Sequence, residues 1–108
     1  MYIHRHESSI PIQIFSTTIQ ETGTFEIDLI LSVYSNVSDV FCICVEVPGG
    51  NIQDSIKEYE IGKLSTDINY KYTLELNIIL PISIRVYTKH NEAFTITSGD
   101  ILIIRKVA

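Results

Sequence analysis

Residues 70–87, YKYTLELNIILPISIRVY, decide the fold class of this chain. Every even-numbered residue in the stretch is apolar, whereas the odd-numbered residues include the charged side chains Lys71, Glu75 and Arg85. A period of two is typical of a β-strand with one buried face. The stretch therefore predicts strands and not a helix.

Pro81 divides this stretch. Proline has no N–H to donate to a β-ladder, and this one lies on the outward phase of a run that would be unusually long for a single strand. We therefore predict two strands, at about 70–79 and 82–88, that meet at a bend or at a sheet edge.

The composition of the chain also favours an all-β fold. Its 108 residues are 45% hydrophobic and only 19% charged, and Ile, Val, Thr and Tyr prefer strands. A chain of this length normally makes one compact domain. We expect a single domain over residues 1–108, with residues 1–9 loosely ordered as termini often are.

Three further segments alternate or are continuously apolar. Residues 10–20 alternate until Phe15 breaks the pattern, and residues 25–34 give the clearest amphipathic strand of the chain. Residues 40–47 are apolar except for Glu46, which is typical of a central strand covered on both faces.

The remaining segments are shorter. Residues 51–62 fit a helix, but they also fit a loop followed by a strand at about 56–61, which the all-β context favours. Strands are expected at residues 94–97 and 101–107, with a tight turn at 98–100 between them.

The spacing of Leu64 and Tyr70 resembles the corner of Greek-key sandwiches, where a tyrosine hydroxyl bonds back to the preceding loop. Together the strands predict an antiparallel, immunoglobulin-like Greek-key β-sandwich of about eight strands. The core between its sheets is expected to contain the residues at the apolar, inward-facing positions of the three most clearly predicted strands. These residues are Phe25, Leu29, Leu31, Ile43, Val45, Leu74, Leu76 and Ile78.

No arrangement of residues in the sequence points to a reaction centre. The sequence has no Gly-x-Ser-x-Gly elbow and no Gly-rich phosphate loop, and His4 and His6 lack a third metal ligand in view. Cys42 and Cys44 would point the same way from one strand, so we expect unbridged, packed thiols. We predict that the protein is not an enzyme, that it has no catalytic or metal-binding residue, and that it uses no cofactor.

The net charge of -5, with dispersed lysines, argues against binding to nucleic acid or directly to anionic membranes. The N-terminus has no apolar signal-peptide region, and no run is long enough to cross a bilayer. A cytoplasmic location is expected.

Several segments, taken in order, resemble the μ-homology domain of clathrin adaptor medium subunits, also found in the coatomer δ subunit, the stonins and the muniscins. They are PIQI (11–14), ETG (21–23) with residues 25–31, VFCICVEVP (40–48), EYEIGKL (58–64), PISIRV (81–86), and Phe94 with Ser98-Gly99 and ILIIRKV (101–107). The chain departs from the family's pattern at Tyr59, where a tryptophan is usual. It also lacks a second proline after Pro48, and it is far shorter than the whole domain.

The resemblance covers about residues 10–97 and is to the second, inserted sandwich of that domain. It implies a non-enzymatic protein-interaction module of membrane traffic, peripheral at vesicle coats, with coat or adaptor subunits as partners. The family's tyrosine-motif pocket lies in the first sandwich, so no cargo-contacting residue is carried over.

Two other functions fit the sequence. One is a self-assembling structural β-sandwich of viral or surface origin that forms a symmetric homo-oligomer, and the other is a small-ligand or carbohydrate-binding sandwich. For any protein partner, the candidate contacts are residues on outward phases that core packing does not explain. They are Ile30, Tyr34, Ile79 and Tyr87.

Overall fold

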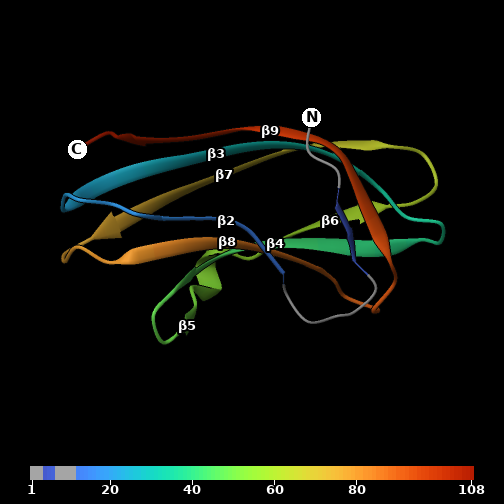
Figure 1. The fold of residues 1–108 in the computed structure, drawn as a ribbon, viewed down its shortest axis with the longest axis horizontal. Helices are drawn as coiled ribbons and strands as arrows, with labels where there is room; N and C mark the ends of the chain where they lie inside the picture. The colour runs from blue at the N-terminus through green and yellow to red at the C-terminus, as the bar shows by residue number, and fades with distance from the viewer. Residues whose placement is uncertain (1–3, 7–11) are drawn as a thin grey trace.

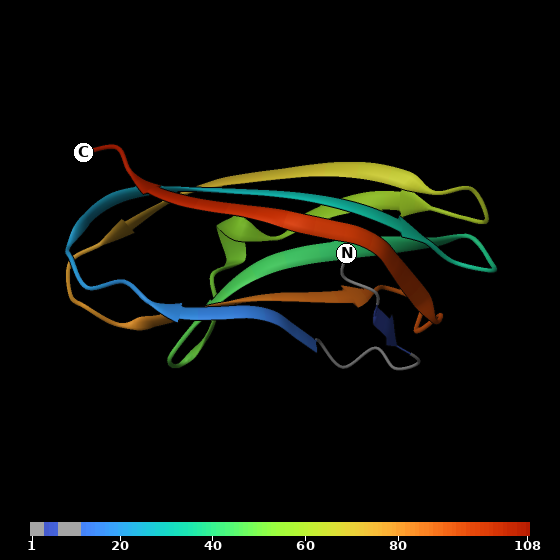
Figure 2. The same ribbon diagram turned by 45° about the horizontal axis from the view of Figure 1, so that its top comes forward.

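The structure is a β-sandwich of two antiparallel sheets (Figures 1 and 2). The computed structural model describes residues 4–6 and 12–108, with the side chains of 12–98 and 104–108. Sheet A has the order β1 (His4–His6), β9 (Phe94–Lys106), β3 (Gly23–Tyr34), β7 (Thr66–Leu76). Sheet B has the order β2 (Ile12–Thr18), β8 (Pro81–Thr88), β4 (Asp39–Val47), β5 (Gly50–Asn51), and β6 (Lys57–Ile61) also pairs with β4. The all-β sandwich is confirmed, with nine strands in the described residues where about eight were predicted.

The stretch around Pro81 forms two strands in different sheets. β7 ends at Leu76 in sheet A, and β8 begins at Pro81 in sheet B. Residues 77–80 cross between the sheets, so the apolar alternation there does not belong to a strand. Ile78 is consequently 64% exposed, and its predicted place in the core is wrong.

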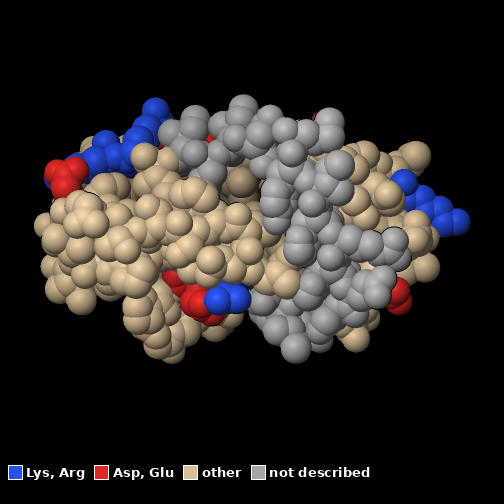
Figure 3. Space-filling view, in the orientation of Figure 1, with Lys and Arg blue, Asp and Glu red and all other residues tan. Residues whose placement is uncertain are grey.

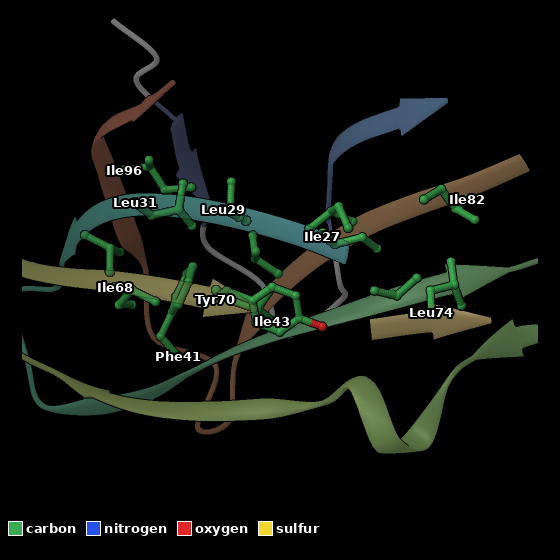
Figure 4. Packing of buried hydrophobic residues seen from close by; sticks show 14 of the residues in the cluster. Ile27, Leu29, Leu31, Phe41, Ile43, Ile68, Tyr70, Leu74, Ile82 and Ile96 are labelled. Carbon is green, nitrogen blue, oxygen red and sulfur yellow. The ribbon is translucent and has the colours of Figure 1, made fainter. Parts of the chain in front are cut away.

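The other predicted core residues are buried, and they pack with further apolar side chains from both sheets (Figure 4). The Tyr70 hydroxyl lies in this core and donates a hydrogen bond to the Ser55 carbonyl oxygen at 2.7 Å. Tyr70 therefore bonds back to an earlier segment, but this segment precedes β6 and is not the predicted loop directly before β7. Leu64 takes no part in the corner, because its side chain is 85% exposed.

Two irregular positions have a structural cause. The register of β2 against β8 shifts between Gln13 and Phe15, so the broken alternation at Phe15 marks a β-bulge. In β9 the predicted tight turn at 98–100 is wrong, since Phe94–Lys106 is one strand. Its pairing with β3 shifts on both sides of Ser32, and these irregularities absorb the extra residues within the strand.

The ambiguous segment 51–62 contains a short 3₁₀ turn, Gln53–Ser55, followed by β6. The loop-then-strand interpretation is therefore confirmed over the helix. Within the N-terminal segment expected to be loose, residues 4–6 form β1 against β9, and the rest lies outside the described residues.

Candidate functional site

The four predicted partner contacts do not form one surface. Ile30 and the half-buried Tyr34 lie on the outer face of β3 in sheet A, and Ile30 is 41% exposed. Tyr87 lies half-buried on β8 in sheet B, and Ile79 is 52% exposed in the connection between β7 and β8. The structure brings only the first pair together, so a shared contact role for all four stays a prediction.

Apolar side chains that sequence reasoning missed lie at the two ends of the sandwich. Val37 and Leu64 are exposed in neighbouring loops, which the Ser35 N–H joins to the Gly62 carbonyl at 2.8 Å. Ile78 is exposed beside Ile79 at the opposite end, where β7 turns into β8 (Figure 1). Their polar sequence neighbours mark turns, but turn signals do not show whether an apolar side chain there is covered.

A hollow of about 450 Å³ lies over the outer face of sheet B, beside the β4–β5 turn. Its polar groups largely satisfy one another: Arg85 Nε donates to Glu46 Oε1 at 2.8 Å, and Ser83 Oγ donates to Gln13 Oε1 at 3.2 Å. None of the described residues that line it has an aromatic side chain. The hollow is therefore an open surface depression with a mixed polar and apolar lining, and it is not an enclosed cavity.

Cys42 and Cys44 are free and buried on β4, as predicted. They pair across the sheet with Tyr87 and Arg85, respectively. Burial raises the pKa of both thiols, and it raises that of Cys44 to about 11. A cysteine nucleophile must ionise, so the environment of both residues suits packing and not catalysis.

We expect Cys42 and Cys44 to react slowly with an aromatic disulfide reagent at pH 7 in the native protein. Both thiols are buried and held protonated, while reaction requires an accessible thiolate. The release of the coloured thiolate should become fast when urea unfolds the chain. Two equivalents released at once from the native protein would contradict this expectation.

Asp39 is a second feature that sequence reasoning missed. Its side chain is 0% exposed, and Oδ1 accepts the backbone N–H groups of Val40 at 2.6 Å and His90 at 3.0 Å. Oδ2 accepts the Glu92 N–H at 3.1 Å, and His90 Nδ1 lies 3.0 Å from Oδ1. Burial raises the pKa of Asp39, but these hydrogen bonds outweigh burial and lower it overall.

The Asp39–His90 pair anchors a turn and does not form a catalytic triad. No described serine or cysteine hydrogen-bonds to the His90 ring, which is largely exposed. The described residues also contain no group of three side chains that could hold a metal ion. The side chains of His4 and His6 lie outside the described set.

Within the described chain no helix is long and apolar enough to span a bilayer.

The comparisons with known proteins show the fold. No protein-family model matches the chain, and no curated protein matches it in sequence. A chain in the structure of infectious bursal disease virus, Gt strain, is similar with a TM-score of 0.67 and 10% identity. The match covers 95% of this chain and 30% of the viral chain, so the protein spans less than a third of that neighbour's length.

Two sugar-binding proteins are also similar. The C-terminal domain of the sugar-binding protein EclA gives a TM-score of 0.54 at 11% identity, covering 96% of this chain and 77% of that one. The xylan-binding domain CBM22-1 of Paenibacillus barcinonensis Xyn10C gives 0.53 at 14%, covering 86% and 65%. Such low identities establish a shared β-sandwich and no shared ligand. The resemblance to the μ-homology domain stays a prediction.

Proposed function

We propose that this protein is a non-catalytic assembly module that builds a structural complex from copies of itself. The observation that carries the proposal is the long open edge of sheet A, formed by β7. β7 is an 11-residue strand that pairs with β3 on one side, and no described strand pairs with its other side. An edge of this kind is a template for a further strand.

Most other sheet edges in the described chain are short or bulged: β1 has three residues, β5 has two, β6 has five, and β2 carries the bulge at Phe15. β1 pairs only with residues 94–96, so within the described strands the rest of β9 is also an open edge, but the register of β9 against β3 is irregular on both sides of Ser32. Short strands and bulges are the usual devices that prevent unwanted pairing at an edge. β7 has neither, and so it is the edge best suited to assembly.

The surface supports an interaction role. On the described part of the face seen in Figure 3, charged side chains stand in small groups of both signs amid uncharged side chains. Ile78 and Ile79 add exposed apolar area next to the end of β7. Exposed apolar side chains beside a sheet edge are typical of surfaces that contact another protein.

Self-assembly is tested by measuring the mass of the purified chain. Size-exclusion chromatography with light scattering, run over a concentration series, should give the mass of a closed symmetric oligomer. A monomer at every concentration would contradict the proposed function.

A second candidate is an adaptor-type module that binds another protein through Ile30, Tyr34, Ile79 and Tyr87. It is favoured by the substantial exposure of Ile30 and Ile79 and by the collinear resemblance to the μ-homology domain. Recovery of coat or adaptor subunits with the wild-type chain, and their loss with Ile30→Asp or Ile79→Asp, would support it. Equal recovery with both variants would rule these contacts out.

Sugar binding, the role of two structural neighbours, is less well supported for this chain. The hollow on sheet B offers polar groups, but Arg85 and Glu46 are already paired. Sugar sites in proteins usually present an exposed aromatic ring, which the described lining of this hollow lacks.

A further inference from the structure

We propose that β7 pairs antiparallel with β7 of a second copy, about a two-fold axis at Asn69, so that two A sheets join into one continuous sheet. This inference rests on the proposed self-assembly and names its interface. It commits to one register of the two strands, which the charges on the edge select.

The backbone groups that face outward can be assigned from one contact. Lys57, on β6 of the other sheet, donates its ammonium group to the Lys71 carbonyl oxygen. That carbonyl therefore points away from β3. In an antiparallel strand, N–H and C=O of one residue point to the same side, and every second residue repeats the direction. Asn69 and Thr73 accordingly present free backbone groups at the open edge.

The side chains of the same residues lie on the outer face of sheet A. The odd-numbered residues of β7 from Asp67 to Glu75 are exposed, whereas the even-numbered residues face the core. A strand added at this edge would place its own outward side chains directly beside those of β7. The register is therefore decided by the charges of these odd positions.

The charges alternate in sign every four residues along the edge, at Asp67, Lys71 and Glu75, and Lys63 in the loop before β7 continues the alternation. With the axis at Asn69, Asp67 lies opposite Lys71 of the second copy, and Glu75 lies beside the second copy's β6–β7 loop, which carries Lys63. Every charged pair is then attractive. An axis at Lys71 would instead place that lysine opposite itself and Asp67 opposite Glu75, and like charges directly opposite are destabilising.

One other symmetric register is compatible with the charges. An axis at Thr73 pairs Lys71 with Glu75 but leaves Asp67 opposite Ile79, beyond the end of the strand at Leu76. Within the strand each of these two registers pairs two charges, but the axis at Asn69 also brings Glu75 beside the loop that carries Lys63, whereas the axis at Thr73 brings Asp67 beside the apolar Ile79. The Asn69 register is therefore favoured.

Lys57 partly protects the open edge of β7 from pairing. Its hydrogen bond occupies the Lys71 carbonyl, which the second copy also needs, so it opposes pairing by one contact in each copy. Lys57 is exposed, and it can leave the carbonyl without unfolding any strand. A lysine at an edge is a common protection against uncontrolled pairing. It restricts association here to a partner that matches the charges.

Matched proline variants test the backbone part of the proposal. Asn69→Pro removes the N–H at the axis without breaking a bond to β3, and Thr73→Pro removes an equivalent outward N–H outside the central pairs. In sedimentation equilibrium, N69P should weaken the dimer at least about tenfold, and T73P should weaken it much less. A wild-type oligomer that N69P leaves unchanged would overturn this interface while the proposed self-assembly stands. The reverse ranking of the two variants would establish the Thr73 register instead.

A charge swap tests the register without proline. Asp67→Lys and Lys71→Asp should each weaken the dimer at least about tenfold, because each places like charges opposite one another. The double variant D67K/K71D should restore it, since the pairs are then reversed but opposite in sign. Thermal midpoints verify that every variant is folded. A double variant as weak as the single ones would overturn the register, and a wild-type monomer at all concentrations would overturn the interface and the proposed function together.

Discussion

Leu31→Ala should lower the free energy of unfolding by about 2–5 kcal/mol, the range expected when a fully buried leucine is truncated. Leu31 is 1% exposed in β3, opposite Ile68 of β7, and lies in the packed core of Figure 4. Truncation removes apolar contacts and leaves a cavity that the neighbouring strands cannot fill, because their ladders fix them. Urea unfolding followed by circular dichroism measures the change.

Leu64→Ala is the matched control, since it removes the same atoms from an exposed side chain in the β6–β7 loop. Its free energy of unfolding should lie within about 0.5 kcal/mol of the wild type. Equal losses for Leu31→Ala and Leu64→Ala would mean that the two leucines do not differ in burial.

Local alternation was sufficient to predict most strands, because each buried face leaves a period of two in the sequence. The strand from Phe25 onward was recognised this way, whereas β4, which is covered on both faces, was recognised by its continuous apolar run. Alternation failed at Ile78, where the chain crosses from one sheet to the other. The crossing keeps the apolar pattern but not the strand, and only tertiary structure shows where a sheet ends.

Less of the candidate sites could be predicted from the sequence. The alternating pattern of its strand correctly predicted that Ile30 lies on the surface. No local signal, however, shows that Tyr87 lies on the other sheet. The alternating charges from Lys63 to Glu75 are visible in the sequence. Their meaning depends on β7 being an open edge, and strand order is set by contacts between segments far apart in the chain. Asp39 was missed for the same reason, since its partners lie about 50 residues further on.

Replacing Asp39 should be the most costly polar substitution in the described chain. Asp39→Ala leaves the N–H groups of Val40, His90 and Glu92, which donate to this buried carboxylate, without their acceptor, and we expect a loss of about 2–4 kcal/mol. Asp39→Asn should cost less, because the amide oxygen can still accept at one position. Asp54→Asn, at an exposed carboxylate, is the matched control and should change stability by less than about 0.5 kcal/mol.

The same carboxylate makes stability depend on pH in acid. The pKa of Asp39 is lower in the folded protein than its ordinary value of 3.8, so the folded state binds the proton less readily than the unfolded chain. The stabilisation from Asp39 is therefore complete above about pH 5 and is lost as the pH falls through the folded pKa. Urea midpoints measured between neutral and strongly acid pH should fall more steeply for the wild type than for D39N, which has no carboxylate to protonate there. Parallel curves for wild type and D39N would show that Asp39 does not carry this pH dependence, whereas D54N should follow the wild-type curve.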